Sequence, residues 1–307
     1  MQHDVIIIGG SFAGLAAALY LVRARRSVCI IDTGKPRNRF AAQSHGVFAQ
    51  DGSSPQQMLA TARAQVSTYP SVTFVQGSAV EVQRQRNGLA VTLATGEVVV
   101  GTTLLLAFGV ADVLPSINGL AQRWGTSVIH CPYCHGYEFS GRQLGVLQLS
   151  PMSHHQAQLI SEWGPTTYFL NGAEQPDAAT LAEFARRNIR IAPAAIDALH
   201  GAGGDLSHVQ LVDGSAWPIE ALFIGPPTKL NSHVAAQLGC RINSGPFGTY
   251  IEVDEMKMTS VAGVYAAGDI TRGGGHTVTF ACADGVMAAL AIHRSLITSA
   301  AQLERAL

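Results

Sequence analysis

Residues 4–21 read DVIIIGGSFAGLAAALYL. An apolar run of strand type leads into a glycine turn, and an Ala/Leu-rich helix follows. In a dinucleotide-binding βα unit, Gly9 makes the tight turn, Gly14 lets helix and strand pack closely, and the helix N-terminus binds a pyrophosphate. Ser11 replaces the middle glycine of the usual GxGxxG pattern. Asp32 ends the next expected strand, where an acidic side chain binds a ribose hydroxyl, so the spacing favours a dinucleotide site over an ordinary glycine-rich turn.

A second motif reads HCPYCHGYEF over residues 130–139. Cys131 follows a strand-like run, and Pro132 suits the first position of a helix because no backbone N–H is needed there. At a helix N-terminus the helix dipole favours a thiolate. We therefore predict that Cys131 and Cys134 form a nucleophilic redox pair.

Three alternatives compete for this motif: a pair of buried hydrophobic cysteines, a zinc site that adds His130 and His135, and a glutaredoxin-like domain. A structural zinc site draws a second ligand pair from a distant segment, and this chain has no second Cys-x-x-Cys or Cys/His pair. A glutaredoxin-like domain carries its dithiol near its start, whereas here a nucleotide-binding pattern comes first. We therefore predict no metal. The remaining cysteines are isolated: Cys29, Cys240 and Cys282.

The composition sets broad limits. The chain has 307 residues, of which 47% are hydrophobic, and this is enough for two domains. Its 20 basic and 21 acidic residues give a net charge of -1 without a long like-charge run, which argues against a nucleic-acid or membrane partner. No apolar run approaches the ~20 residues that span a bilayer, and no signal peptide is legible. We expect a cytoplasmic protein, in which a paired dithiol is catalytic more often than structural.

The middle of the chain carries a second strand–turn–helix pattern that lacks phosphate-binding chemistry. Gln143–Leu149 is expected to be a strand, and Pro151 in the following turn has no N–H. After the next expected strand, Thr166–Leu170, no Arg is present to bind a 2′-phosphate. We predict an α/β fold with two Rossmann-like domains. The expected segments are 1–112 and 244–307 for a cofactor domain, and 113–243 for an inserted dithiol domain.

Two further stretches are placed to bind a cofactor. Thr33–Ser54 is a long polar loop after a Rossmann strand, and it contains Arg39 and His45. Near the C-terminus, Gly268 and Asp269 follow a strand beside the start of the last helix, which suits a ribityl or phosphate group.

Short alternating strands are expected between the first turn and the dithiol. Asn87-Gly88 and Thr95-Gly96 are typical of hairpin turns. Glu97–Val100 and Thr103–Gly109 are expected to be separate strands, the second returning to the first sheet.

Taken together, these motifs resemble the low-molecular-weight thioredoxin reductase family of flavoproteins. The resemblance covers essentially the whole chain and implies FAD as cofactor, an FAD domain in two segments, and a homodimer. It also implies that Cys134 exchanges electrons with the flavin, while Cys131 attacks the substrate sulfur. The predicted cofactor-binding residues are Gly9, Gly10, Ser11, Phe12, Ala13, Gly14, Asp32, Arg39, His45, Val80, Gly109, Gly268, Asp269, His276 and Thr277.

Two departures change the expected activity. His135 stands where the family has an acid, and the family's NADPH motifs are absent. The dithiol motif instead looks like that of the FAD-dependent dithiol oxidases, which close disulfides in sulfur-containing natural products. This resemblance implies that the Cys131–Cys134 disulfide oxidises a small-molecule dithiol, that His135 shuttles thiol protons, and that oxygen or another acceptor reoxidises FAD.

Two other functions stay open beside the oxidase. One is a thioredoxin reductase fed by NADPH at an unusual site or by a ferredoxin-type donor. The other is a non-catalytic flavin-bound redox sensor, or a resistance protein that sequesters a reactive disulfide. For His135 the alternative is a helix-cap or packing role.

Overall fold

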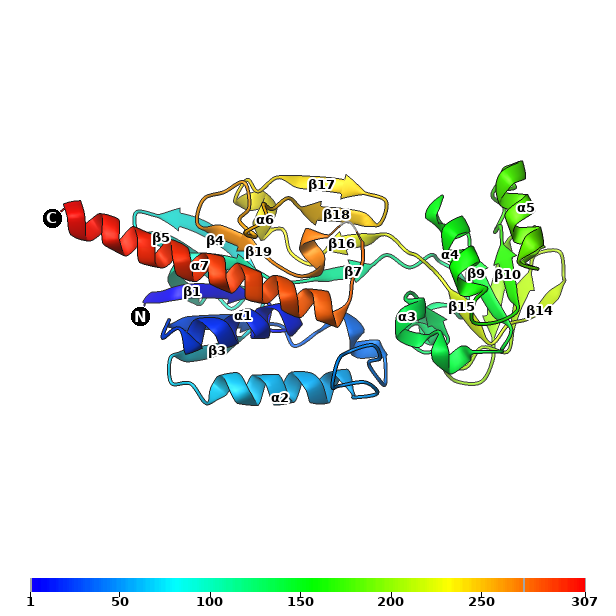
Figure 1. Ribbon diagram of the computed structural model, residues 1–307, viewed down its shortest axis with the longest axis horizontal. Helices are drawn as coiled ribbons and strands as arrows, with labels where there is room; N and C mark the ends of the chain where they lie inside the picture. The colour runs from blue at the N-terminus through cyan, green and yellow to red at the C-terminus, as the bar shows by residue number, and fades with distance from the viewer. Residues whose placement is uncertain (1, 273, 307) are drawn as a thin grey trace. The chain divides into compact units, whose positions relative to one another are not determined.

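The computed structural model describes residues 2–272 and 274–306, with side chains described through residue 298. The chain folds as two compact units (Figure 1). The first comprises Met1–Arg37, Gln56–Ala111 and Thr228–Leu307, and the second comprises Asn38–Pro55 and Asp112–Pro227. Each unit contains a parallel sheet with helices, which confirms the predicted α/β fold with two Rossmann-like parts.

The limits of the units differ from the predicted domain boundaries in two places. Thr228–Leu230 forms β16, which pairs with β18 (Gly248–Ile251) in the first unit, so the chain returns after Pro227 rather than after residue 243. Residues 38–55 cluster with the dithiol unit, because Phe40 lies against Gly125 and His45 reaches Glu138. Both differences arise from contacts that are distant in sequence.

A mainly parallel sheet forms the centre of the first unit. Its strands are β1 Gln2–Ile8, β2 Val28–Asp32, β3 Val72–Gln76, β4 Ala79–Gln85, β5 Gly88–Leu93, β6 Val98–Leu106 and β19 Val264–Ala266. The order is β3-β2-β1-β6-β5-β4, and β19 also pairs with β6. The register places Ile7 opposite Ile30 on one side and Leu105 on the other. The carboxyl ends of β1, β2, β6 and β19 therefore lie at one edge, where open α/β sheets bind their ligands.

Strand β6 corrects the prediction of two separate strands over Glu97–Val100 and Thr103–Gly109. It is continuous through Gly101. A Cβ at Gly101 would lie 2.6 Å from the side chain of Ile6 on the neighbouring strand. This glycine therefore permits close packing of β6 on β1 and does not break the strand.

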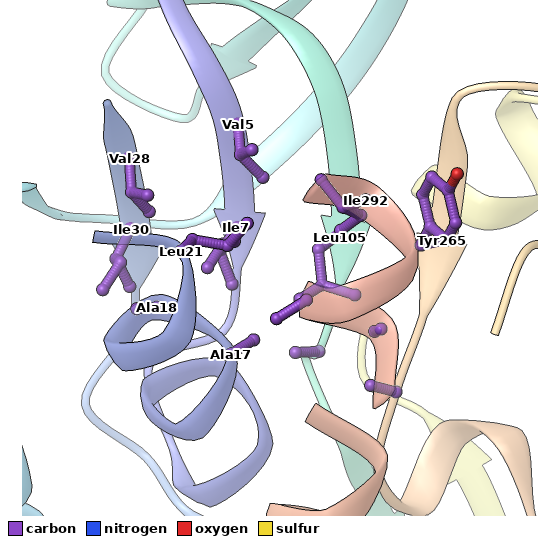
Figure 2. Packing of buried hydrophobic residues seen from close by; sticks show 14 of the residues in the cluster. Val5, Ile7, Ala17, Ala18, Leu21, Val28, Ile30, Leu105, Tyr265 and Ile292 are labelled. Carbon is purple, nitrogen blue, oxygen red and sulfur yellow. The ribbon is translucent and has the colours of Figure 1, made fainter. Parts of the chain in front are cut away.

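Helices α1 (Phe12–Arg23) and α7 (Val278–Ala306) cover one face of this sheet. Figure 2 shows Ile7 and Leu105 from the strands packed with Ala17 and Ile292 from the two helices. Each fully buried Ile or Leu side chain contributes roughly 1.5–3 kcal/mol of hydrophobic stabilisation. The helices approach closely, because a Cβ at Gly285 of α7 would lie 2.1 Å from the carbonyl oxygen of Ala13.

Helix α7 corrects the prediction that no apolar run reaches the length of a membrane span. Val278–Thr298 is long and apolar enough to cross a membrane by length and composition. Its Ala288, Ala289 and Ile292 are buried in the core with α1. Core packing therefore accounts for the apolar residues on that side of the helix.

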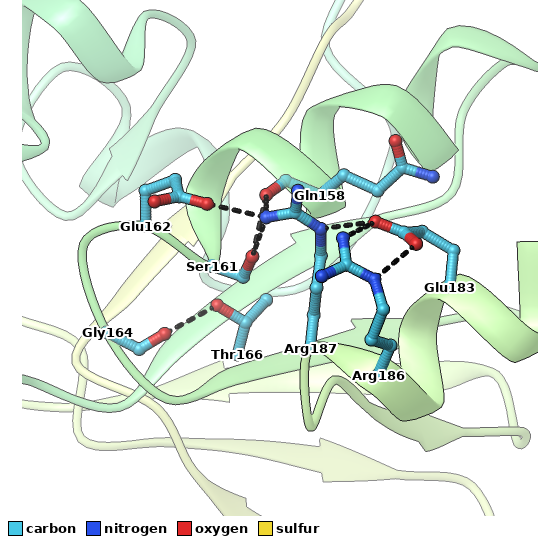
Figure 3. A network of polar contacts seen from close by, with 8 residues as sticks. All are labelled: Gln158, Ser161, Glu162, Gly164, Thr166, Glu183, Arg186 and Arg187. Atoms are coloured by element: carbon cyan, nitrogen blue, oxygen red, sulfur yellow. Dashed lines mark hydrogen bonds and ion pairs between the residues drawn. The ribbon is translucent and has the colours of Figure 1, made fainter.

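A five-stranded parallel sheet forms the centre of the second unit, in the order β11-β10-β9-β15-β8. Its strands are β8 Val128–Ile129, β9 Leu144–Leu147, β10 Thr166–Phe169, β11 Arg190–Ala192 and β15 Ala221–Phe223. Arg187 ties the end of α5 (Ala178–Arg186) to the end of α4 (Met152–Ile160), with bonds to Glu183 at 2.6 Å and Glu162 at 2.5 Å (Figure 3).

Smaller elements complete the two units. A three-stranded antiparallel sheet has the order β12-β13-β14, and a four-stranded sheet has the order β17-β18-β16-β7. Their remaining strands are β7 Val110–Asp112, β12 Ile196–His200, β13 His208–Leu211, β14 Ala216–Pro218 and β17 Ile242–Gly245. Two more helices of the first unit are α2 Pro55–Ser67 and α6 Val234–Gln237.

A buried ionic network joins α7 to the segment after β19. Asp284 is 3% exposed and accepts hydrogen bonds from Arg272 at 2.7 and 3.0 Å and from Thr271 at 3.2 Å, and Lys257 lies 2.8 Å away. Burial acts to raise the pKa of Asp284, but the bonds and charges of Arg272 and Lys257 outweigh burial and lower that pKa. The network thereby fixes η4 (Asp269–Thr271) against α7.

Replacing Asp284 with Asn should lower the free energy of unfolding by about 3 kcal/mol at neutral pH, because Lys257 and Arg272 would keep their charges without a carboxylate. The stabilisation should be complete above the ordinary aspartate pKa of about 3.9 and should vanish as the pH falls through the lowered pKa of the folded state. Urea unfolding of the wild type and D284N at neutral and acid pH measures both effects.

Glu255→Gln removes an exposed carboxylate near Lys257 and serves as the control, with an expected change below about 0.5 kcal/mol. If D284N were as stable as the wild type at neutral pH, the network would not have the role described.

Candidate active site

The dithiol lies at the end of β8. Cys131 caps α3 (Pro132–His135), with Pro132 in the first helical position as predicted, and the amides of Cys134 and His135 donate to the carbonyl of Cys131 at 3.3 and 3.2 Å. This turn places the Cα atoms of Cys131 and Cys134 5.3 Å apart, and their sulfurs form a disulfide. A disulfide at this position is the form of the pair that can accept electrons from a thiol.

Trp163 packs against this turn at Gly136 and Tyr133. A Cβ at Gly136 would lie 2.6 Å from the carbonyl oxygen of Pro132 and 3.0 Å from the Trp163 ring. The ring of Tyr133 packs edge-on against Trp163 at 5.8 Å, yet Tyr133 is 72% exposed and Tyr137 is 82% exposed. The dithiol turn thus packs against Trp163, while Tyr133 and Tyr137 expose their side chains to solvent.

His135 directly follows the second cysteine and is half-buried. Burial lowers its pKa, the charge of Glu138 acts to raise it, and His45 lowers it further. Because the net direction is downward, the imidazole is neutral at neutral pH and is suited to accept a proton from a thiol.

His45 lies with the dithiol turn in the second unit. Its Nε2 is 3.5 Å from Glu138 Oε1, its Nδ1 is 3.7 Å from Asp51 Oδ1, and its ring meets that of His135 edge-on at 6.0 Å. The sequence pattern placed His45 in a cofactor loop, since nothing local indicates the contact with Glu138. Its predicted role in binding the cofactor stays a prediction.

The other cysteines differ sharply from the pair. Burial raises the pKa of Cys29 to about 11, and burial also raises the pKa values of Cys240 and Cys282. Thiols of high pKa carry little thiolate near neutral pH and are chemically quiet. Thiol chemistry in this chain is therefore concentrated at Cys131 and Cys134.

The glycine turn after β1 has the geometry of a phosphate site. Gly9 has φ +112°, and a Cβ there would lie 2.2 Å from the carbonyl oxygen of Ala107, while a Cβ at Gly14 would lie 1.9 Å from that of Gly9. Gly10 donates its N–H to Asp32 at 3.0 Å. Ser11 caps α1 without a side-chain hydrogen bond to the first turn, which leaves the helix amides open to an anion.

The second predicted cofactor motif lies directly beside this turn. Gly268 has φ +81°, and a Cβ there would lie 3.0 Å from the Cβ of Ala13 in the first turn of α1. Asp269 is paired with Arg37 at 3.0 Å. The residues present therefore fit a dinucleotide such as FAD, because Asp32 bonds to the glycine turn and Gly268, next to Asp269, packs against the first turn of α1.

Arg37 lies beside a predicted cofactor residue, Asp269, although the prediction chose Arg39 from the same loop. Arg39, two positions later, lies with its guanidinium 4.1 Å from the Phe40 ring centroid. Both arginines fall in the same polar loop, and no local signal separates them. The pairing of Arg37 with Asp269 depends on residues far apart in the chain.

The other predicted cofactor residues have structural contacts of their own. The carbonyl of Val80 accepts from Gln237 at 3.0 Å, and that of Gly109 accepts from Asn231 at 3.2 Å. His276 Nε2 lies 3.2 Å from the carbonyl oxygen of Arg272. Thr277 accepts the N–H of Phe280 at 3.2 Å and so caps α7. Phe12 and Ala13 open α1. For all of these, contact with a cofactor stays a prediction.

The turn after β9 has the same strand–turn–helix topology as the first turn, but a side chain of the protein itself accepts hydrogen bonds from its amides. Ser153 Oγ accepts the N–H of Leu149 at 3.0 Å and that of Ser150 at 3.2 Å. After β10, Asn171 accepts the N–H of Ile196 at 2.9 Å. The amides of Leu149 and Ser150, which could otherwise bind a phosphate at this turn, are therefore already satisfied within the protein.

Comparisons with known proteins agree with this arrangement. The family described as pyridine nucleotide-disulphide oxidoreductase matches residues 3–147. Thioredoxin reductase tcpT of Claviceps purpurea is 31% identical, over 87% of this chain and 86% of its own length. Thioredoxin reductase sirT of Leptosphaeria maculans is also 31% identical, over 87% and 86%.

Solved structures show the same likeness. The oxidoreductase from Agrobacterium tumefaciens is 42% identical, covering 97% of this chain and 99% of that chain with a TM-score of 0.93. HlmI is 33% identical, covering 99% and 96%, with a TM-score of 0.92. The predicted family is thereby confirmed, while the homodimer and the cytoplasmic setting stay predictions. The chain belongs to the pyridine nucleotide-disulphide oxidoreductase family, within which it is a thioredoxin reductase-like flavoprotein enzyme.

Proposed function

We propose that this enzyme is an FAD-dependent dithiol oxidase, which closes an intramolecular disulfide in a small-molecule dithiol. One observation carries the proposal: the turn that would bind a nicotinamide cofactor is closed by Ser153, whereas the dithiol is complete and stands beside a neutral histidine. Electrons would then enter from a thiol substrate instead of from NADPH.

The chain's own residues account for the thiol steps. His135 takes the proton from a substrate thiol, and the resulting thiolate attacks Cys131, so a mixed disulfide forms and Cys134 leaves as a thiolate. The second substrate sulfur, after losing its proton, attacks the first, so the bond from that sulfur to Cys131 breaks and Cys131 leaves as a thiolate. The cyclic disulfide product is released, and the cysteine pair has gained two electrons. The assignment of Cys131 to the substrate side rests on the family resemblance.

The cofactor would be held by the first unit. The pyrophosphate would face Gly9, Gly10, Gly14 and the start of α1. Asp32 would face a ribose, and the Arg37–Asp269 pair would face the ribityl end. When bound, FAD would accept two electrons from the cysteines and so return them to the disulfide. Oxygen or another external acceptor would then reoxidise FAD.

Exposed aromatic side chains support a small substrate that carries an aromatic or apolar body. Phe48 is 96% exposed, on the same loop as His45. Gly46 lies near Tyr133, since a Cβ on Gly46 would be 3.8 Å from the Tyr133 carbonyl oxygen. With Tyr133 and Tyr137, Phe48 offers rings on which a planar substrate can stack.

A thioredoxin reductase is the second candidate, because the relatives tcpT and sirT carry that name. It differs from the oxidase in the source of its electrons. The closed turn at Ser153 argues against NADPH as that source.

Cys131→Ser and Cys134→Ser should each lower dithiol oxidation by at least about a thousandfold, because no mixed disulfide can be resolved onto a single cysteine. Both variants should stay yellow. Oxygen uptake with dithiothreitol measures the rate, and visible absorbance measures the bound flavin. Cys240→Ala removes a thiol outside the pair and should keep near wild-type activity. Full turnover by C131S would refute the scheme.

Anaerobic mixing separates the oxidase from the reductase. A dithiol should bleach the flavin absorbance, and NADPH should leave it unchanged, because the amides of Leu149 and Ser150 are taken by Ser153. Stopped-flow absorbance is the measurement. Prompt bleaching by NADPH would support the reductase instead.

Phe48→Ala should raise the KM for an aryl-substituted dithiol by about fivefold to tenfold, the effect of one aromatic contact, and should leave the kinetics with dithiothreitol unchanged. Val212→Ala, at an apolar side chain that is 65% exposed elsewhere in the same unit, is the control. An equal change with both substrates, or no change with either, would remove Phe48 from the substrate site.

A further inference from the structure

Four ionisable side chains meet beside the dithiol from two distant stretches of chain. His45 and Asp51 come from residues 38–55, and His135 and Glu138 come from the dithiol turn. Glu138 is 3.5 Å from His45 Nε2, Asp51 is 3.7 Å from His45 Nδ1, and the two imidazole rings are 6.0 Å apart. His45 is thus enclosed between two carboxylates and one imidazole.

The proposed reaction needs a second proton acceptor beside His135. Closing one disulfide releases two thiol protons, and His135 can hold one beyond its neutral form. His135 is half-buried, whereas Asp51 on the far side of His45 is 72% exposed. A proton taken by His135 therefore has a neighbouring imidazole, and beyond it an exposed carboxylate, on the way to water.

We propose that His45 is a positioning residue of the active site, which acts through His135 by sharing Glu138 with it and by receiving the proton that His135 takes from the substrate. This inference rests on the proposed oxidation of a dithiol. A proton on His45 lies near the carboxylates of Asp51 and Glu138, so His135 is returned to its neutral form for the second thiol.

Glu138 and His45 influence His135 in opposite senses. The charge of Glu138 acts to raise the pKa of His135, and a charge on His45 acts to lower it, in addition to the lowering by burial. The described contacts place the ring of His45 against that of His135, and the carboxylates of Asp51 and Glu138 against His45. Removing either neighbour should therefore shift the titration of His135, and the two shifts should have opposite signs.

The loop does not depend on His45 for its shape. Ser44 and Ser53 form a backbone bridge, with Ser44 N to Ser53 O at 2.8 Å and Gly52 N to Ser44 O at 2.9 Å. Asp51 also accepts the N–H of Gly46 at 2.8 Å. A substitution at His45 is therefore expected to keep the loop folded, and its effect will report on the charge at that position.

The test uses the flavin-loaded oxidised protein with His45→Gln and Glu138→Gln. NMR of imidazole nitrogens in histidine-labelled protein follows the titration of His135, assigned with His135→Gln. H45Q should move the midpoint to higher pH and E138Q to lower pH. His208→Gln, in the stacked pair with His200 on β12 and β13, is the matched control and should not move the titration of His135.

A kinetic measurement joins the titration to the reaction. The rate at which dithiothreitol reduces the flavin without oxygen should fall about tenfold in H45Q at neutral pH, since a general base contributes 10²–10⁴-fold and His45 acts only through it. The acid limb of the pH profile should follow the shifted midpoint in each variant. His45→Asn provides the same test if H45Q does not give a folded spectrum.

The outcomes separate the two proposals. Opposite shifts with a matching pH profile support the role of His45. Shifts of the same sign, or none, overturn it even if the wild type oxidises dithiols. Opposite shifts in a wild type that oxidises no dithiol would leave the electrostatic coupling intact and refute the proposed function, and with it the proton transfer assigned to His45.

Discussion

Backbone amides at the start of a helix need a hydrogen-bond acceptor, and the two strand–helix turns of this chain meet that need in different ways. At α1 Asp32 accepts the N–H of Gly10, but Ser11 makes no side-chain bond to the first turn of the helix, and the missing Cβ atoms at Gly9 and Gly14 let backbone approach backbone. At α4 the hydroxyl of Ser153 takes two of the turn amides. The start of α1 is thus left without a side-chain cap, whereas Ser153 takes the amides of Leu149 and Ser150 before α4. The proposed direction of electron flow depends on this difference.

Residues from both ends of the sequence build the site at the start of α1. Gly268 packs against Ala13, and Asp269 pairs with Arg37, although long stretches of chain separate the partners. Asp284 holds the same turn from α7 through Arg272 and Lys257. A cradle fixed in this way is formed before any ligand arrives, so binding would cost little ordering of the protein.

The elements that sequence reasoning predicted well are those set by local physics. The buried strand, the glycine turn and the Pro132 helix start each follow from neighbouring residues, and the structure has them in place. The errors come from contacts between distant segments. The grouping of residues 38–55 with the dithiol depends on Glu138 and Gly125, and the end of that unit depends on the pairing of β16 with β18. Arg37 could not be chosen over Arg39 for the same reason.

A histidine at position 135 favours oxidation of a substrate thiol, because it is a better base than a carboxylate would be at that position. Moving a proton from a thiol of pKa about 8.5 to an ordinary imidazole costs about 3 kcal/mol, whereas moving it to an ordinary carboxylate costs about 6 kcal/mol. An acid at position 135 would therefore be a poor base for a substrate thiol, and His135 is a much better one. Burial works against this advantage by lowering the pKa of His135. The charge of Glu138, which also lies 3.5 Å from His45, offsets part of that loss and so favours thiol deprotonation, the first step in oxidising a dithiol.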